Sequence, residues 1–285
     1  MAGPSAAPPS LCTAGHRLLE LLFQEPGLVE YPLPERLSQH YGGGLGFQEP
    51  LWYANFVSSL DGVVSVPGRA HVGSLLSAHS QADRFSMALL RACADAVVVG
   101  AGTLRDSPGT LWTAERAYPS LAPEFQELRR RLARSPQPQL VVVTRSGELD
   151  PTHPALQEGV LVVAPDAKVG QLKDRLGPST SWLGYPGPQV DWAWLARQLL
   201  ARGLRAVLTE AGPTTMGRLL ELGLVDELFL TLAPTVAGTP VGYQRSGFAG
   251  GVDLLGKGDA RAHLLATRRA GDHLLLRYRL DTAAK

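Results

Sequence analysis

The chain has 285 residues, of which 45% are hydrophobic and 19% are charged. This composition is ordinary for a globular protein, and the length suffices for one large or two small domains with a sizeable core. Because 27 Lys and Arg stand against 26 Asp and Glu, the net charge of +1 favours neither nucleic acid nor an anionic membrane surface as a partner.

Targeting segments and metal motifs are not apparent in the sequence. No apolar run approaches the roughly 20 residues that span a membrane, and residues 1–10 have no basic segment leading into an apolar core, so we expect a cytoplasmic protein. Cys12 and Cys93 cannot form a C-x-x-C or zinc-ribbon set, and the motifs of zinc-dependent nucleobase deaminases are absent. We expect no metal site, and we expect Cys93 to be a small core residue.

The N-terminal part of the chain, residues 1–48, is predicted to be an extension ahead of a larger domain of residues 49–285. Its first ten residues are rich in Ala, Pro and Ser, which is typical of disorder. Leucines at 18, 19, 21 and 22 predict a short helix, and the Pro and Gly residues that follow predict a loop to about residue 50.

The remainder of the chain alternates between predicted strands and helices. Strands are predicted over 51–57, 96–100, 139–144, 159–165 and 225–234. Residues 205–213 are predicted to form a further strand followed by a turn. Helices are predicted over 80–93, 123–133, 191–201 and 214–222, with Ser80 and Asp191 as caps of the first and third. Residues 263–269 and 273–280 predict an antiparallel hairpin around a Gly-Asp turn. This order predicts the α/β class, with a mixed, mainly parallel sheet flanked by helices.

The segment from Asp95 to Pro108 is the most informative stretch. A buried strand runs directly into Gly100-Ala-Gly102-Thr103, where small side chains let a ligand approach the backbone closely. Because ligands of open α/β sheets bind beyond the carboxyl ends of the strands, this edge is a candidate cofactor or substrate site. The pattern G-x-G-x-x-R lacks the third glycine of the usual dinucleotide fingerprint, and a tight structural turn is the alternative interpretation.

A second candidate is the sequence TEAGPTT at 209–215. It follows an apolar strand and begins a helix at Pro213, so free backbone N–H groups, Gly212 and two hydroxyl groups could face a pyrophosphate. Glu210 is out of place beside a phosphate, and we expect it to contact a ribose, a base edge or the substrate. The alternative is a capped helix with a surface glutamate.

Two further positions lie at predicted strand ends. Thr144, Arg145 and Ser146 could hold a ribose 2′-phosphate and so select NADPH, although an exposed loop arginine explains the same residues. Asp61 could orient a substrate or relay a proton, whereas Asp-Gly is also a frequent turn pair. Outside these candidates, we expect Asp226 and Glu227 to be structural and the arginines at 129–131 to face water.

Three blocks of sequence occur in an order that is more specific than any single motif: NFVSSLDG, LRACADAVVVGAGTLRDSP and VLTEAGPTTMGRLLELGLVDELFLTLAPTVAG. Over roughly residues 51–280 the chain resembles the pyrimidine reductase family of riboflavin biosynthesis. This family includes the C-terminal reductase domain of the bifunctional deaminase-reductase, which has a dihydrofolate reductase-like fold. The segment with Tyr31-Pro32 ahead of the first strand resembles stand-alone members of that group, and the deaminase half is absent.

The resemblance implies NADPH-dependent reduction of a small molecule, 5-amino-6-(5-phosphoribosylamino)uracil, to its ribityl form by a homodimer whose interface is formed by the C-terminal strands. Asp61 and Glu210 would be the catalytic residues. The implied cofactor-binding residues are Val99, Gly100, Gly102, Thr103, Leu104, Thr144, Arg145, Ser146, Glu210, Ala211, Gly212, Pro213, Thr214 and Thr215. The implied substrate-binding residues are Asn55, Ser58, Asp61, Ser74, Arg91 and Arg105.

Three departures from the family pattern keep alternatives open. Asn55 stands where many members carry Lys, and Ala211 replaces the first glycine of the usual Glu-Gly-Gly. The usual Asp-x-Pro after the GAGT loop is present as Asp106-Ser107-Pro108, with different residues ahead of it. The change at Asn55 favours a reductase of the same fold that acts on another heterocycle, such as a dihydropterin. A nucleotide-binding protein without turnover is the third hypothesis, which the presence of Asp61, Thr103 and Glu210 disfavours.

Overall fold

The computed structural model describes residues 17–66, 68–239, 241, 246–257 and 261–281. The predicted disorder of residues 1–10 and the position of Cys12 lie outside the described residues. Within the described part of the chain, no helix combines the length and the hydropathy needed to cross a membrane.

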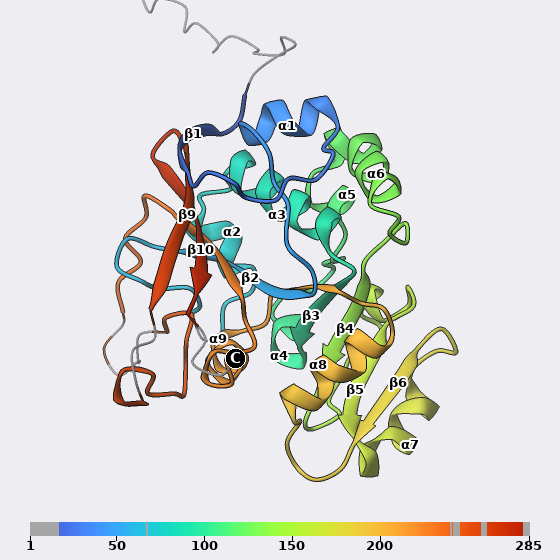
Figure 1. Cartoon of the computed structure of the whole chain (residues 1–285). Coiled ribbons are helices and arrows are strands. Elements are labelled where there is room, and N and C mark those ends of the chain that lie inside the picture. The colour runs from blue at the N-terminus through green and yellow to red at the C-terminus, as the bar shows by residue number, and fades with distance from the viewer. Residues whose placement is uncertain (1–16, 67, 240, 242–245, 258–260, 282–285) are drawn as a thin grey trace, which may run out of the picture.

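The described residues form one ten-stranded sheet, in the order β1-β9-β10-β8-β2-β7-β3-β4-β5-β6 (Figure 1). All pairs from β8 to β6 are parallel, and β10, β9 and β1 extend the sheet with antiparallel pairs. The predicted mixed, mainly parallel sheet is confirmed. The strands are β1 (Glu20–Gln24), β2 (Leu51–Ser58), β3 (Ala96–Gly100), β4 (Gln139–Val143), β5 (Leu161–Pro165), β6 (Ser181–Tyr185), β7 (Ala206–Thr209), β8 (Glu227–Leu232), β9 (Ala262–Ala270) and β10 (His273–Leu280).

Two hydrophobic cores lie on opposite faces of this sheet. In β3, Val97 and Val99 belong to one core, and Ala96 and Val98 belong to the other, so the strand is apolar at every position, as predicted for a strand buried on both faces. Helices α1, α3, α6 and α7 pack on the first face, and α8 and α9 pack on the second. The helices are α1 (Glu35–Tyr41), α2 (Val72–Leu76), α3 (Gln81–Cys93), α4 (Ala101–Arg105), α5 (Ala114–Ala117), α6 (Ala122–Arg131), α7 (Asp166–Arg175), α8 (Trp192–Ala201) and α9 (Pro213–Glu221).

Local signals in the sequence account for several element boundaries. Ser80 caps α3 by accepting a hydrogen bond from the Asp83 N–H, and Asp191 caps α8 by accepting one from Trp194. Gly271 has a φ of 57° in the two-residue turn that joins β9 and β10. Cys93 is fully buried at the end of α3, as predicted, and burial raises the pKa of its thiol to about 12.

The prediction for the N-terminal extension is wrong in two respects. The leucine-rich segment is a strand, β1, which pairs with β9, because an open sheet edge offers backbone partners that a short isolated helix lacks. The predicted loop contains α1, which Pro34 precedes and which ends at Gly42 in the left-handed conformation. The division at residue 48 stays a prediction, but β1 joins the extension to the main sheet.

The expectation that all three consecutive arginines face water is wrong for Arg129. Its side chain is buried and donates hydrogen bonds to the carbonyl oxygens of Ala92, Ala94 and Ser135 at 3.1, 2.7 and 2.6 Å. Neighbouring residues of a helix point about 100° apart, so one member of such a run faces inward. Arg129 thereby provides partners for carbonyl groups at the C-terminal end of α3.

Candidate active site

The two glycine-bearing segments predicted from the sequence lie side by side. Because β7 separates β2 from β3 in the sheet, the carboxyl ends of these three strands are neighbours. Helix α4 begins directly after β3, and α9 begins four residues after β7 ends. A Cβ atom placed on Gly100 would lie 3.8 Å from Thr215 Oγ1, and one placed on Gly212 would lie 3.7 Å from Thr103 Oγ1. The two segments therefore form one continuous rim.

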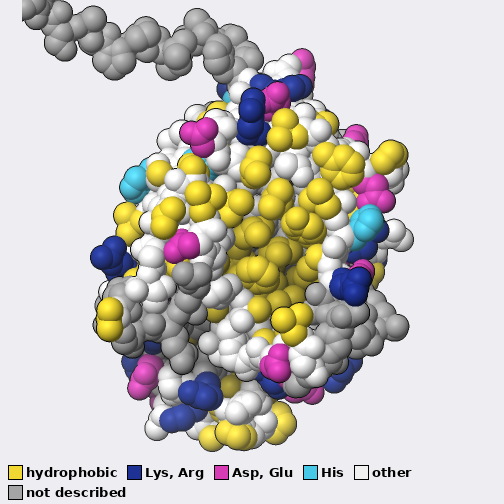
Figure 2. Space-filling view, turned by 90° about the vertical axis from the view of Figure 1, so that its left-hand side faces the viewer, with side chains coloured by type: hydrophobic (Ala, Val, Ile, Leu, Met, Phe, Trp, Pro, Cys, Tyr) yellow, Lys and Arg dark blue, Asp and Glu magenta, His cyan; other side chains and the backbone are white. Residues whose placement is uncertain are grey.

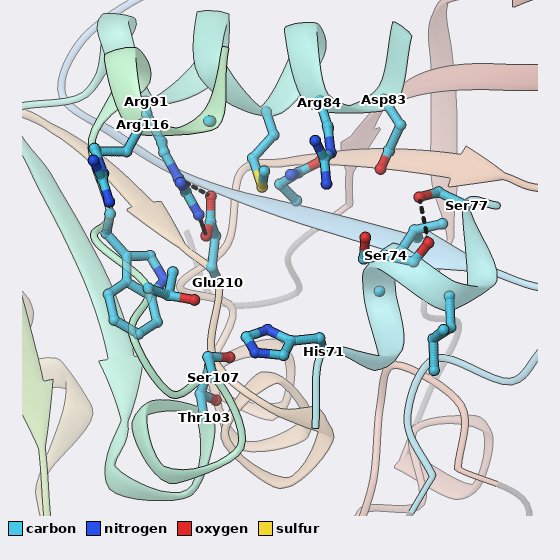
Figure 3. A pocket seen from close by; sticks show the side chains of 18 of the residues that line it. His71, Ser74, Ser77, Asp83, Arg84, Arg91, Thr103, Ser107, Arg116 and Glu210 are labelled. Carbon is cyan, nitrogen blue, oxygen red and sulfur yellow. Dashed lines mark hydrogen bonds and ion pairs between the residues drawn. The ribbon is translucent and has the colours of Figure 1, made fainter. Parts of the chain in front are cut away.

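A cavity of about 770 Å³ opens beside this rim (Figure 3). Its walls come from the end of β2, from α2 and α3, and from the segment 107–117 that follows α4. Five of the predicted site residues line the cavity: Asn55, Ser74, Arg91, Thr103 and Glu210. The fold thus brings together residues from five separate parts of the sequence.

An ion pair between Arg91 of α3 and Glu210 forms one end of the cavity (Figure 3). Arg91 Nε lies 3.0 Å from Glu210 Oε1, and Arg91 Nη2 lies 2.6 Å from Oε2. The Glu210 N–H also donates to the Val98 carbonyl oxygen at 3.1 Å, which fixes the backbone at the end of β7. The alternative of a surface glutamate is therefore wrong, since Glu210 is nearly buried and held in a two-pronged contact.

Five charged or titratable residues that the sequence did not single out also line the cavity. They are His71, His79, Asp83, Arg84 and Arg116. No ion pair joins Arg84 or Arg116 to another described residue, and both side chains are exposed. Burial raises the pKa of Asp83, which the hydroxyl groups of Thr231 and Ser77 partly offset. No periodic pattern marks these residues, because their common feature is a cavity that only the fold creates.

The wall formed by α2 carries unusual backbone conformations. His71, Ala78 and His79 have φ values of 53°, 49° and 58°, which side-chain-bearing residues rarely adopt. His71 N–H donates to the Asp106 carbonyl oxygen at 3.0 Å, and Ser74 Oγ lies 2.9 Å from His79 Nδ1. Backbone conformations of this kind cluster at ligand sites. No sequence pattern predicts them at these three residues.

Asp61 lies outside the residues that line the cavity. Its Oδ1 accepts hydrogen bonds from Ser59 Oγ at 2.6 Å and from the Ala237 N–H at 3.0 Å, and its Oδ2 accepts one from the Gly238 N–H at 2.9 Å. These donors, the Ser59 hydroxyl first, lower the pKa of Asp61 to about 2. Gly62 follows with a φ of 83°, so the geometry agrees with the Asp-Gly turn interpretation.

Other predicted site residues also have structural contacts. Thr144 Oγ1 accepts from the Gly147 N–H at 3.0 Å, and Ser146 Oγ accepts from the Glu148 N–H at 3.2 Å, which leaves the exposed Arg145 as the projecting group of that trio. Val99, Leu104, Ala211 and Ser58 are buried, and Arg105 is exposed beyond the cavity lining. Within the described residues, no group of three or more His, Cys, Asp or Glu side chains could hold a metal ion.

Comparisons with known proteins agree with this architecture. The family model described as RibD C-terminal domain matches residues 50–263. The 2,5-diamino-6-ribosylamino-4(3H)-pyrimidinone 5′-phosphate reductase of Archaeoglobus fulgidus is 28% identical over 196 residues, which cover 66% of this chain and 82% of that protein.

Two solved structures share the fold. A pyrimidine reductase-like protein of Corynebacterium diphtheriae superposes with a TM-score of 0.63 at 22% identity, covering 88% of this chain and 96% of the other. RibD of Acinetobacter baumannii gives a TM-score of 0.62 at 22% identity over 86% of this chain, which spans only 60% of that protein. The chain belongs to the RibD C-terminal domain family, the pyrimidine reductases of riboflavin biosynthesis, and has the dihydrofolate reductase-like fold that the sequence blocks implied.

Proposed function

We propose that this riboflavin-pathway reductase uses NADPH to reduce the ribosyl carbon of a 5-amino-6-(5-phosphoribosylamino)pyrimidine. The observation that carries the proposal is the cavity in which Thr103 and the Arg91–Glu210 pair meet beside the glycine-bearing ends of β3 and β7. The uracil form is the substrate that the sequence resemblance implied. The archaeal relative is named for the form that carries an amino group at C2.

The cofactor would lie along the rim formed by α4 and α9. Gly100, Gly102 and Gly212 have no side chain there, and an added Cβ on each would come within 4 Å of a Thr or Arg side chain, so larger residues would narrow the rim. The first backbone N–H groups of α9 suit a pyrophosphate. Arg145 follows β4, which pairs with β3, and its guanidinium suits a ribose 2′-phosphate. A bound reduced nicotinamide supplies the hydride.

The substrate would occupy the cavity. Of the three arginines in the cavity lining, Arg91 is paired with Glu210, whereas no ion pair joins Arg84 or Arg116 to another described residue. We assign the 5′-phosphate to Arg84 and Arg116. The Arg91–Glu210 pair, fixed by two hydrogen bonds, would position the ribosyl carbon or the nicotinamide amide. Positioning supplies most of the rate acceleration in such a reaction, because the hydride comes from the cofactor.

We also propose that the protein is a homodimer joined through its C-terminal strands. Figure 2 shows an apolar, hollowed area on the side of the molecule that carries β9 and β10. Phe56, Leu230, Leu276 and Tyr278 lie on the β2-β8-β10 part of the sheet and are only partly buried. A contiguous apolar face of this kind marks an interface. Light scattering should give twice the chain mass, and Leu276→Arg should give the monomer.

The direct test of the proposed function is an assay of purified protein with NADPH and each pyrimidine ribosylamine phosphate. Loss of the nicotinamide absorbance, with formation of the ribityl product, is expected. Because Asn55 lines the cavity where many family members carry Lys, a dihydropterin serves as the competing substrate. Reduction of the pterin alone would support the alternative, and binding without any turnover would contradict the reductase.

A further inference from the structure

Asp83 lines the cavity and carries a carboxyl group that has no role in the proposed reaction. It is the third residue of α3, and Figure 3 shows it projecting into the cavity opposite Ser77, at the end away from the Arg91–Glu210 pair. No ion pair joins it to another described residue. Its hydrogen-bond partners in the protein are the hydroxyl groups of Thr231 and Ser77. A carboxyl group that faces a cavity and has no cation beside it suits a ligand that donates further hydrogen bonds.

A structural role at the start of the helix does not explain this side chain. In a capping box, the acidic side chain at this position would accept from the N–H of the capping residue. Here the Ser80 N–H donates instead to the Ser77 carbonyl oxygen at 3.0 Å, and only the Asp83 backbone N–H takes part in the cap. The carboxyl group therefore does not cap its own helix: it lies at the cavity wall, where the hydroxyl groups of Thr231 and Ser77 hold it.

The surroundings of Asp83 orient it without neutralising it. The hydroxyl groups of Ser77, after α2, and Thr231, on β8, lower its pKa; His273 on β10 lowers it further, and Glu210 raises it. The effect of burial is larger than that of these groups, so the pKa of Asp83 is raised overall. A ligand that brings N–H donors to the carboxylate would favour its charged form and so offset the effect of burial.

The walls beside Asp83 suit a flat heterocycle. Met87 lies one helical turn further along α3, and Leu75 and Val57 line the same cavity from α2 and β2. The cavity thus offers apolar side chains, a carboxyl group at one end, and two unpaired arginines, Arg84 and Arg116, in the same lining. This arrangement matches a pyrimidine base that carries a phosphorylated sugar.

We propose that Asp83 binds the C2-amino and N3–H edge of the pyrimidine, and that the reductase therefore acts on the diaminopyrimidinone rather than on the uracil. This inference rests on the proposed function and selects between its two substrate forms. In the diaminopyrimidinone these two groups are adjacent donors, and one carboxylate can accept a hydrogen bond from each. In the uracil the C2 position carries a carbonyl oxygen, whose lone pairs would face those of Asp83. A site built for one hydrogen-bonding pattern rejects the other strongly.

The test compares kcat/KM for the two substrates, which differ only at C2, in the unmodified enzyme and in Asp83→Asn. We expect the unmodified enzyme to prefer the amino form by about 100-fold or more. An asparagine amide presents one donor and one acceptor, which complements the uracil edge, so the ratio should fall by at least about tenfold or invert. Asp272→Asn, which removes an exposed carboxylate in the β9–β10 turn, should leave the ratio unchanged.

Equal kcat/KM values for the two substrates in the unmodified enzyme, a preference for the uracil, or an unchanged ratio in Asp83→Asn would overturn the inference. If neither substrate is reduced, the proposed function fails, and calorimetry still tests the inference. The free bases 2,5,6-triamino-4-pyrimidinone and 5,6-diaminouracil are titrated into both proteins, with circular dichroism as the check on folding. Tighter binding of the triamino base that is lost in Asp83→Asn supports the assignment to Asp83, and equal affinities contradict it.

Discussion

Two buried Arg–Glu pairs in this molecule have nearly the same geometry but different surroundings. Arg277 and Glu227 are joined by hydrogen bonds of 2.7 and 3.1 Å, and Arg91 and Glu210 by bonds of 3.0 and 2.6 Å. The side chains are 6% and 11% exposed in the first pair, and 4% and 10% in the second. Burial and pairing alone therefore do not distinguish a structural ion pair from one in a site.

The space beside each pair makes the distinction. The Arg277 guanidinium lies 5.2 Å and 5.5 Å from the ring centroids of Phe47 and Phe229, and it also donates to the Gly46 carbonyl oxygen. The void beside it has about 20 Å³, which is room for about one water molecule. Arg91 and Glu210 instead face the cavity of about 770 Å³. Every partner of the first pair is protein, whereas the second pair can contact a ligand.

The largest effect is expected from Arg277→Met, which breaks the enclosed pair. Glu227 would remain buried without its cation, so the free energy of unfolding should fall by about 3–5 kcal/mol. Urea unfolding at neutral pH measures this change, and kcat of the folded protein should be unaltered. A large loss of kcat with unchanged stability would show that the enclosed pair also serves the site.

The complementary change is Glu210→Gln in the cavity-lining pair. It should lower kcat roughly 100-fold, because a small misplacement of a positioning group has an effect of that size. Its stability loss should be smaller than that of Arg277→Met, since water in the cavity can solvate Arg91. Glu227→Gln is the matched control. It should lower the free energy of unfolding more than Glu210→Gln does, and it should leave kcat unchanged. Equal losses of kcat and equal losses of stability in the two variants would contradict the contrast between the two pairs.

Much of the fold was predictable because its signals are local. Ser80, Asp191 and the Gly271 turn mark element ends by chemistry that neighbouring residues supply, and β3 shows its burial by a continuous apolar run. Strand β1 was not predictable, because its partner β9 lies more than 200 residues away in the chain. Long-range pairing decided between helix and strand for that short segment.

The candidate site likewise contains some residues that the sequence predicts and others that it does not. Glu210, Thr103 and the glycines stand in motifs next to strand ends, so the sequence identified them. Asp83, Arg84 and Arg116 stand on ordinary helical positions, and only the packing of α3 and α5 around the cavity reveals what they share. Asp61 shows the reverse case, since a suggestive position at a strand end proved to hold a turn and the backbone of Ala237 and Gly238.

A smaller effect is expected at the proposed adenosine end of the rim. Arg145→Ala should reduce the preference for NADPH over NADH by about 10- to 100-fold, which corresponds to about 1.5–3 kcal/mol for one hydrogen bond to a charged group. Dissociation constants for both dinucleotides measure it. Equal affinities in the unmodified protein would contradict the assignment of NADPH.

The smallest effect concerns the pH dependence of Asp61. A lowered pKa contributes stability that is present above the unfolded value of about 4 and is lost as the pH falls through about 2. Asp61 is therefore ionised throughout the neutral range. Asp61→Asn should lower kcat more than cofactor affinity by loosening the 237–238 backbone, and this loss of kcat should be independent of pH between about 5 and 9. An ionisation that disappears from the pH–rate profile in Asp61→Asn would instead make Asp61 a proton relay.

The contrast between the two pairs depends on the claim that reduction takes place in the cavity that Arg91 and Glu210 line. Reaction with NADPH deuterated at C4 of the nicotinamide, on the face that is transferred, tests this claim directly. We predict one deuterium at the former ribosyl carbon of the product, found by mass spectrometry and NMR, with a yield per unit time that falls roughly 100-fold in Glu210→Gln and is unchanged in the folded fraction of Glu227→Gln. A product without deuterium, or equal losses in the two variants, would contradict it.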